Sequence, residues 1–418
     1  MRRIAIVGAG QAGLQLALGL LAADYEVTLV ADRSPDEVRQ GQVTSTQIMF
    51  HTALDQEREL GLNHWEDQTP PIEGLGITVA TPDGVRRADW MGRLDHYAQS
   101  VDQRVKMAGW MEEFTERGGH LVLRAAGVAD LEALSRGHDL VVVATGKGEL
   151  STLFARDPLH SPFLTPQRAL SAAYVHGLGP RLDHDRPGLS ASFVAGVGAL
   201  FVLPSYTTSG PCGALLWEAV PGGPADVFAG VRDPGERLRL ILELVERHTP
   251  WEHARTAKVE LTDERATLTG GYPPVVRHPV AELPSGALVL GAGDVLVLAD
   301  PAGAQGANSA AKCATAYLRS IVEHGDGPFD REFMERTFAR YWDTAGAAIT
   351  RFTNTMLAPL PEHVQRMFMV ANEYPEVADR FVNAFDDPSL LRDWFYQPEE
   401  MARYLDDVRM RGGAGAGA

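Results

Sequence analysis

The chain is poor in cysteine, in basic residues and in long apolar runs, and each shortage excludes a class of protein. Its 418 residues include two cysteines, Cys212 and Cys313, which are too few and too far apart for a disulfide-stabilised secreted domain. No run of eighteen apolar residues occurs, so neither a membrane-spanning helix nor a signal peptide is predicted. We therefore expect a cytoplasmic protein in which both cysteines are small buried side chains.

Basic residues are the minority among the charged residues. The chain has 38 lysines and arginines against 55 aspartates and glutamates, which gives a net charge of −17. A surface of this sign repels phosphate groups, and this argues against nucleic acids and against membranes as partners. The length is sufficient for two domains with a sizeable core.

The N-terminus carries the strongest motif. An apolar, β-branched run at residues 3–7 leads directly into a glycine turn, and apolar residues at helical spacing follow. Strand, glycine turn and helix in this order are typical of dinucleotide-binding folds. The first glycine permits the turn, the second leaves room for a pyrophosphate against backbone N–H groups, and the third lets the helix approach the strand. The predicted contacts are Gly8, Ala9, Gly10, Gln11, Ala12 and Gly13.

A second strand is expected at residues 26–30, and its end is the usual place for an acidic residue that holds the ribose hydroxyls. Ala31 occupies that place here, and Asp32 and Arg33 follow it directly. We expect Asp32 and Arg33 to contact the cofactor from this slipped position.

Two further apolar runs have the appearance of buried parallel strands. Residues 139–146 end in Thr145-Gly146, and residues 287–294 end in Gly293-Asp294. The carboxyl ends of such strands meet beside the first glycine turn, where open α/β sheets bind their ligands. Thr145, Gly146 and Asp294 are therefore candidate cofactor contacts.

A second glycine-rich turn runs from Asp300 to Asn308 and precedes a helix of small residues at 309–321. Such a turn presents bare backbone N–H groups and the positive end of a helix to an electron-rich ligand. A close contact between the helix and the sheet would explain the same glycines and alanines without any ligand.

The middle of the chain has a different texture. Short alternating runs, broken by glycine and proline, extend from 162 to 283 and indicate an antiparallel sheet with one inserted helix at 234–248. The predicted fold is α/β with four parts: a discontinuous Rossmann-like domain at 1–160 and 285–330, a substrate-binding sheet domain at 161–284 with contributions from about 70–100, C-terminal helices at 331–410, and a disordered tail at 411–418.

Residues 8–13, 139–146 and 291–308 together resemble the FAD-binding framework of flavoprotein monooxygenases with the hydroxylase-type fold. The likeness continues through residues 32–37, 100–104 and 351–354, and over the whole chain it resembles the oxygenase component of two-component styrene and indole monooxygenases. In that group the styrene branch tends to carry Asn, Val and His in a cavity loop, and the indole branch Ser, Gln and Met. This chain has Ser45, Gln47 and Met49, and is similar to the indole branch.

The resemblance implies a specific chemistry. A separate NADH-dependent flavin reductase supplies reduced FAD, so NADH is used indirectly, and the flavin reacts with O₂ to give a C4a-hydroperoxide. This species epoxidises indole, which then yields indoxyl and indigo, or a styrene-like alkene, or it sulfoxidises a thioether. The cofactor performs the reaction and the protein positions it. A homodimer is compatible with this description, and no metal site is implied.

The resemblance also assigns residues. No side chain is expected to act as a covalent or acid–base catalyst; Gln305, Gly306, Ala307 and Asn308 would position the isoalloxazine ring, with Pro301 and Gly303 beside them. A small aromatic substrate would contact six residues: Ser45, Gln47, Met49, Ile72, Leu75 and Ala98. Gln47 or Ser45 would hydrogen bond an indole N–H, and Met49 would provide an adaptable apolar wall.

Two alternatives follow from the same residues. A single-component aromatic hydroxylase that uses NAD(P)H directly also lacks a second nucleotide domain, and a second glycine motif is absent here. A non-catalytic FAD-binding regulator would share the fold. A flavin-dependent halogenase is disfavoured because the W-x-W-x-I-P motif of that family is missing.

Overall fold

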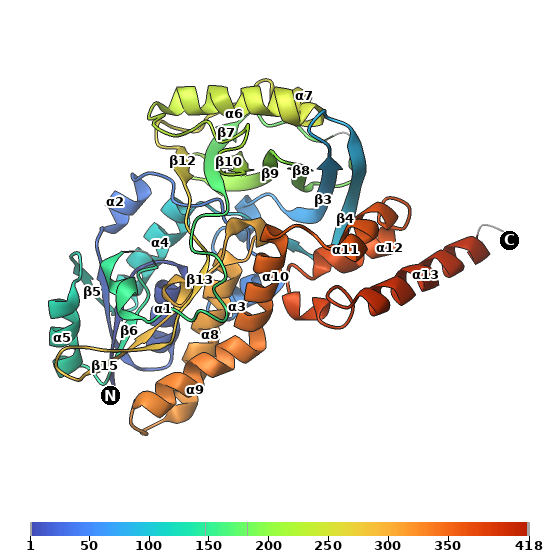
Figure 1. The fold of residues 1–418 in the computed structure, drawn as a ribbon. Coiled ribbons are helices and arrows are strands. Elements are labelled where there is room, and N and C mark those ends of the chain that lie inside the picture. Colours follow the sequence, from blue (N-terminus) through green and yellow to red (C-terminus); the bar gives the residue numbers. More distant parts are fainter. Residues whose placement is uncertain (1, 147, 182, 416–418) are drawn as a thin grey trace.

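The computed structural model describes residues 2–146, 148–181 and 183–415, and it has the predicted α/β fold with two separate sheets (Figure 1). The first sheet has six strands in the order β14 (Val280–Glu282), β15 (Leu288–Gly291), β6 (Leu140–Val143), β1 (Arg3–Val7), β2 (Glu26–Ala31) and β5 (His120–Leu123). All neighbours are parallel except the β14–β15 hairpin. This is the Rossmann-like sheet that the apolar runs predicted.

Helices cover this sheet and complete the first domain. They are α1 (Gln11–Ala22), α4 (Gln103–Glu116), α5 (Val128–Gly137) and α8 (Gly306–His324), with the short helices α2 (Pro35–Arg39) and α3 (His51–Glu59) nearby. Capping residues determine where some of these helices begin. Ser34 and Glu37 form a reciprocal capping box on α2, and Asp102 accepts a hydrogen bond from the Arg104 N–H at the start of α4. Such caps satisfy N–H groups that a helix leaves open at its start.

The second sheet has eight strands. Seven follow the order β11 (Glu260–Leu261), β7 (Ala169–His176), β10 (Gly210–Ala219), β9 (Gly198–Thr207), β8 (Gly188–Val194), β3 (Ile72–Ala80) and β4 (Arg86–Ala98), and β12 (Thr267–Gly270) pairs with β7. Helix α6 (Pro234–His248) covers one face through Leu238, Ile241 and Val245. The strands at 72–80 and 86–98 enter this sheet from the N-terminal half of the chain.

Side chains alternate along β10 between the two faces of the second sheet. Leu215 and Trp217 lie in the cluster under α6, whereas Ala214 and Leu216 lie in a cluster with Ala302 of the 300–308 loop. Period-two alternation is the geometric rule for strands. The opposite face of the sheet therefore looks toward the first domain.

Two boundaries differ from those expected. Strand β14 lies within the 161–284 range but belongs to the first sheet, because a short turn joins it to β15. Strand β13 (Val275–Val276) likewise pairs with β16 (Val297–Leu298) rather than with the eight-stranded sheet. The residue pattern could not separate these two- and three-residue strands from the preceding sheet.

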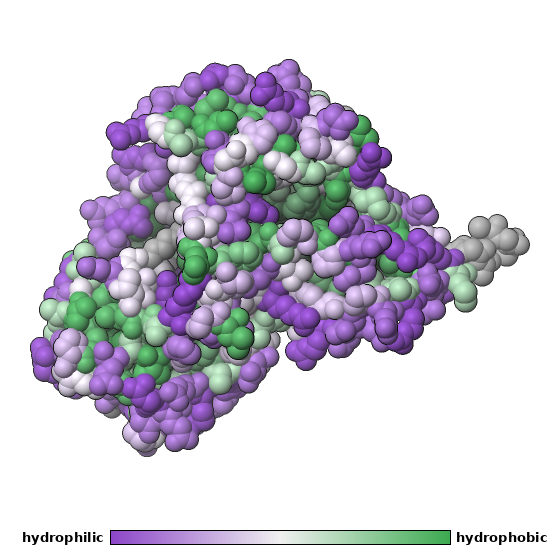
Figure 2. All heavy atoms as spheres, in the orientation of Figure 1, coloured by the Kyte–Doolittle hydropathy of each residue, from purple (hydrophilic) through white to green (hydrophobic). Residues whose placement is uncertain are grey.

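The C-terminal region divides between the two domains. Helix α9 (Arg331–Tyr341) packs on the first domain through Phe333, Met334 and Tyr341. After the π-helical turn η6 (Trp342–Gly346), helices α10 (Ala347–Leu357), α11 (Glu362–Val370), α12 (Pro375–Asn383) and α13 (Pro398–Gly415) pack against the second sheet. In Figure 2, apolar residues gather in the recess between the second sheet, which α6 covers, and these helices.

The end of the chain differs from the expected tail. Helix α13 projects from the body (Figure 1) and continues through residues 411–415, where the composition predicted disorder. The helix is anchored by the buried Met401, Leu405 and Val408, and it extends from this anchored part to Gly415. The rest of the expected tail, 416–418, lies outside the described residues.

Candidate functional site

The glycine turn is closed toward the protein and open toward solvent. A Cβ at Gly13 would lie 2.0 Å from the Gly8 carbonyl oxygen, and one at Gly8, where φ is +120°, would lie 2.5 Å from the Ala144 oxygen. A Cβ at Gly10 would meet no atom within 4 Å. Gly10 also begins α1 without a side-chain cap, so the first N–H groups of this helix remain available to an anion.

The strand ends converge on the same place. A Cβ at Gly293 would lie 2.8 Å from the Ala12 Cβ, and one at Gly146 would lie 3.4 Å from the Asp294 Cβ. The Thr145 hydroxyl is buried without a hydrogen-bond partner among the described residues. These predicted contacts therefore surround one site, and the orphaned hydroxyl and the open space at Gly10 fit a bound dinucleotide.

Asp32 and Arg33 stand at the outer end of β2. Ala31 is buried, but the Asp32 side chain is 69% exposed and its carboxylate is 3.7 Å from the Arg33 guanidinium. Because neither side chain is buried in the protein, both can reach a ligand that lies along the end of the strand.

The loop at residues 300–308 is held by its own side chains. Gln305 is buried, and its Nε2 donates hydrogen bonds to the carbonyls of Gly303 at 3.1 Å and Phe385 at 2.8 Å. Ala304 adopts a left-handed conformation with φ of +53°. The Gln305 amide thus fixes the conformation of the loop. The groups that the loop leaves available to a flavin ring are the backbone N–H groups at the start of α8.

Asn308 connects this loop to the 44–51 segment. Its Nδ2 donates to the carbonyls of Ala304 and Ile48, both at 2.9 Å, and its Oδ1 accepts the Phe50 N–H at 2.8 Å. The side chain is completely buried. The side-chain groups of Asn308 thus join the two loops, and its assignment to positioning the flavin ring stays a prediction.

Some of the polar groups in the 44–51 segment form hydrogen bonds within the protein. Gln47 donates from Nε2 to the Val101 carbonyl at 2.9 Å and accepts from Gln103 at 3.3 Å. The Ser45 carbonyl accepts the Tyr174 hydroxyl at 3.0 Å, whereas the Ser45 hydroxyl is buried with no partner in the described part of the chain. Of the two residues predicted to hydrogen bond the substrate, Ser45 is therefore the one whose side chain has no hydrogen-bond partner in the described chain.

The apolar residues assigned to the substrate fall into two groups. Ile72, Leu75 and Ala98 are buried in the cluster between the second sheet and the C-terminal helices. Met49 lies in a separate cluster with Ala311 of α8. Neighbouring residues of an extended segment point to opposite sides, so Met49 faces α8 while Ile48 faces the sheet.

Buried polar residues that the sequence did not reveal support the site. Beneath the start of α1, Lys106 forms a completely buried ion pair with Glu57 at 2.6 Å, and Glu57 also accepts a hydrogen bond from Gln11 Nε2 at 2.9 Å. No local pattern links positions 57 and 106. These contacts join helix α1 to helix α3, which follows the 44–51 segment.

Two acids are also buried, Glu218 on β10 and Asp300 at the start of the 300–308 loop, which are 1% and 2% exposed. Burial raises the pKa of Asp300 to about 6, and burial followed by the charge of Asp300 raises the pKa of Glu218 well above its usual range. A charged residue inside the apolar run 214–219 was the available sequence signal.

Two cavities of about 560 and 590 Å³ lie elsewhere, around residues 177–181 and 183–188 and strand β4. None of their lining residues is among those assigned to cofactor or substrate.

Within residues 2–146, 148–181 and 183–415, none of the helices has the length and apolarity to cross a membrane.

Comparison with solved structures identifies the same fold in flavin enzymes. The flavin-dependent brominase Bmp2 superposes with a TM-score of 0.67 at 12% identity, over 98% of this chain and 99% of that chain. The tetrameric form of 2-methyl-3-hydroxypyridine-5-carboxylic acid oxygenase gives 0.59 at 16% identity, over 94% and 98%. At these identities the likeness concerns the fold alone.

Sequence comparison is more specific. Residues 146–255 match the family described as styrene monooxygenase A putative substrate binding domain. Styrene monooxygenase StyA of a Pseudomonas species is 32% identical over 413 residues, covering 96% of this chain and 97% of that protein. StyA of Pseudomonas fluorescens is 32% identical over 414 residues, covering 97% and 98%. The chain therefore belongs to the styrene monooxygenase family.

Proposed function

We propose that this protein is the oxygenase component of a two-component flavin monooxygenase. It takes FAD that a separate NADH-dependent reductase has reduced, uses O₂ as co-substrate, and epoxidises indole and styrene-like alkenes or sulfoxidises thioethers. Membership of the styrene monooxygenase family supports the reaction class. The single G-x-G-x-x-G motif is shared by this class and by single-component hydroxylases, so it does not distinguish the two.

The observation that carries this proposal is the joining of the two loops by Asn308. One side chain fixes both the 300–308 loop, proposed to hold the flavin ring, and the 44–51 segment, proposed to line the substrate site. Oxygen transfer requires the flavin and the substrate to be held in one fixed geometry. A rigid link between the two loops supplies it.

When bound, reduced FAD supplies the activation of oxygen. The chain supplies the surroundings: N–H groups of α1 for the pyrophosphate, N–H groups at the start of α8 for the electron-rich edge of the ring, and apolar walls that exclude water. Asp32 and Arg33 stand where the ribose would lie, and Pro301 would shape the contact edge of the ring.

The indole preference rests on the 44–51 segment. The buried Ser45 hydroxyl has no partner in the described chain, and an indole N–H is a suitable donor to it. Met49 would provide an adaptable wall beside α8. Ile72, Leu75 and Ala98 would form the apolar remainder of the pocket.

The experiment combines the purified protein with a flavin reductase, NADH, FAD and catalase in air, with indole in one tube and styrene in another. We expect indigo and styrene oxide only when both proteins are present. NADH consumption that ends in peroxide without either product would contradict the assignment, although it would leave the flavin fold unaffected.

One control separates the alternatives. The protein alone is supplied with FAD and NADPH, and nicotinamide oxidation is followed with and without indole. We expect no oxidation above background. Rapid oxidation by the isolated protein would identify a single-component hydroxylase instead, and binding of reduced FAD without any oxygenated product would favour a non-catalytic regulator.

A further inference from the structure

Glu218 is a buried acid on the side of the second sheet that faces the 300–308 loop. Its neighbours on β10 with the same orientation, Ala214 and Leu216, lie in the cluster that contains Ala302 of that loop. Across the sheet Glu218 is paired with Leu170 on β7 and Ala199 on β9. The carboxyl group therefore stands between the substrate-binding sheet and the loop proposed to hold the flavin.

Neither carboxyl oxygen of Glu218 has a hydrogen-bond partner in the described part of the chain, although the side chain is 1% exposed. An ionised carboxylate is not stable in such surroundings without a counter-charge or donors. Glu218 is thus held as a neutral carboxylic acid, which agrees with the direction of its pKa.

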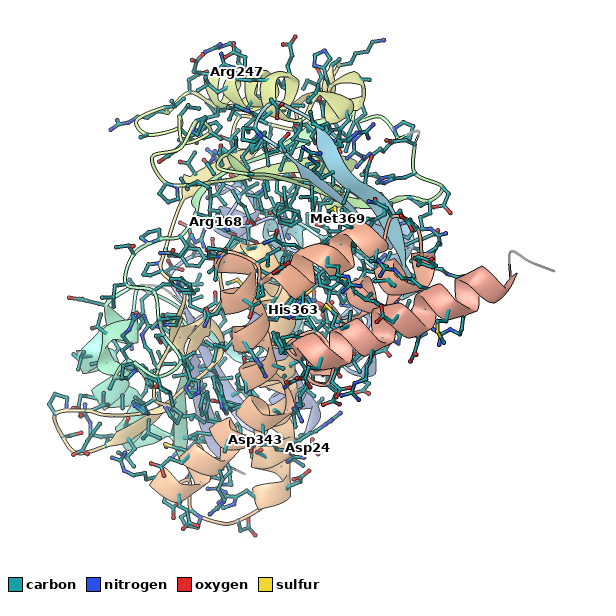
Figure 3. All side chains as sticks on the ribbon, turned by 45° about the vertical axis from the view of Figure 1, so that its right-hand side comes forward. Asp24, Arg168, Arg247, Asp343, His363 and Met369 are labelled. Atoms are coloured by element: carbon teal, nitrogen blue, oxygen red, sulfur yellow. The ribbon has the colours of Figure 1, made fainter. Side chains whose placement is uncertain are left out.

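Asp300, at the start of the loop, is the acid whose negative charge acts on Glu218. It accepts the Ala302 N–H at 3.0 Å, so its ionised form is stabilised more than that of Glu218. Two further titratable groups act on the pair or respond to it. Arg168, before β7, carries a charge that favours ionisation of both acids, and the pKa of the partly buried Tyr272 is raised by burial and by the charges of Asp294, Asp300 and Glu218. Arg168 lies where the second sheet meets the first domain (Figure 3).

We propose that Glu218 and Asp300 form a proton-holding pair at the flavin loop, and that binding of reduced FAD adds a proton to Asp300. In the free protein Glu218 keeps one proton and Asp300 is ionised. When reduced flavin binds, a proton from the solvent adds to the Asp300 carboxylate, and both acids become neutral. This inference rests on the flavin site proposed above.

The physical reason is the charge of the ligand. Reduced flavin carries negative charge on its pyrimidine edge, and its binding displaces water from the 300–308 loop. Both effects penalise a carboxylate at the start of the loop, because like charge and desolvation favour the neutral acid. Proton uptake removes this repulsion, and the site then favours reduced over oxidised flavin as the pH falls.

The test is anaerobic titration calorimetry of the whole protein with chemically reduced FAD near neutral pH, in two buffers with different ionisation enthalpies. The dependence of the heat on the buffer gives the number of protons taken up. The matched variants are Asp300→Asn, which keeps an acceptor for the Ala302 N–H, and Glu218→Gln, which imitates the neutral acid. The difference between proteins cancels protons that the flavin itself exchanges.

We expect the wild type to take up several tenths of a proton more than Asp300→Asn, and Glu218→Gln to behave as the wild type. Equal uptake in the wild type and Asp300→Asn overturns the proposal, as does loss of uptake in Glu218→Gln alone. Absence of any binding of reduced FAD contradicts the proposed function instead, so the two failures are distinguishable.

A measurement on the wild type alone guards against poor folding of the variants. The dissociation constant of reduced FAD is measured against pH, at values where the free flavin is already anionic. Coupled uptake of one proton predicts affinity that rises toward lower pH by up to about tenfold per pH unit. A dissociation constant that does not change with pH contradicts the proposal.

Discussion

At the scale of single residues, Asn308 has the clearest structural role. Its amide satisfies two carbonyls and one N–H that belong to two different loops. Replacing it by alanine leaves three buried backbone groups without partners, and each such group costs about 1–3 kcal/mol. The consequence for the site is loss of the fixed relation between its two loops.

We therefore expect Asn308→Ala to lower the free energy of unfolding by about 2 kcal/mol or more and to reduce kcat/KM for epoxidation more than it weakens FAD binding. Urea unfolding and steady-state kinetics measure the two effects. The matched control is Asn372→Ala, which removes a contact to β4 far from the loops. Equal kinetic losses in both variants would show that Asn308 has no special role.

Ser45 allows a test of substrate preference without a stability penalty. Because its hydroxyl has no partner in the described chain, Ser45→Ala should leave the melting temperature unchanged. If the hydroxyl accepts the indole N–H, the ratio of kcat/KM for indole to that for styrene should fall by about tenfold. An unchanged ratio would place the indole N–H elsewhere.

Glu218 makes stability depend on pH. Its pKa is raised in the folded state, so folding binds a proton that the unfolded chain releases above about pH 4.3. The wild type should lose stability relative to Glu218→Gln as the pH rises above that value, by up to about 1.4 kcal/mol per pH unit. Urea unfolding of both proteins at several pH values measures the difference. A constant difference would mean that Glu218 is ionised at neutral pH.

At the scale of elements, the first strand, turn and helix act as one unit whose glycines have different tasks. Gly13 is required for packing, since a Cβ there would overlap the Gly8 oxygen at 2.0 Å. Gly10 has ordinary extended backbone, with φ of −90°, and open space beside it. The same substitution at the two positions therefore has different expected outcomes.

Gly10→Ala should fold with an unchanged melting temperature and bind FAD at least about tenfold more weakly, because the methyl group would occupy the pyrophosphate space. Gly13→Ala should lose about 1–3 kcal/mol of stability through overpacking. Thermal unfolding without ligand and FAD titration separate the two. Normal FAD affinity in Gly10→Ala would argue that no pyrophosphate lies there.

At the scale of the whole molecule, the C-terminal helices hold the two domains together from one side. Helix α9 packs on the first domain, and helices α10 to α13 cover the side of the second sheet that faces Ala302 of the 300–308 loop. Helix α13 contributes Met401, Leu405 and Val408, each at most 1% exposed. The far end of this helix projects from the body.

Removal of residues 412–418 should therefore leave the melting temperature unchanged. Removal of residues 398–418 should cost about 5 kcal/mol, because it removes three apolar side chains whose burial contributes about 1.5–3 kcal/mol each. Calorimetric melting of the two truncated proteins measures this. A stable, fully active protein without α13 would show that the helix is not part of the cooperative core.

Sequence alone determined the elements whose information is local. The glycine turn after residues 3–7, the buried strand before Thr145 and the helix at 234–248 follow from periodicity, turn chemistry and caps within a few residues. The fold class was predictable for the same reason, because parallel strands alternating with helices admit few arrangements. Short strands such as β13 and β14 were not, since two or three residues carry too little pattern.

Only the tertiary structure decided what each polar side chain does. Residue type made Asn308 and Gln47 candidates for the ligands, but their partners Ile48, Phe50 and Val101 are distant in sequence, and no local rule specifies them. Glu218 could be seen as a charge in an apolar strand, yet its lack of a partner depends on every element around it. Hydrogen bonding and desolvation act between neighbours in space, so these roles became visible only in the folded chain.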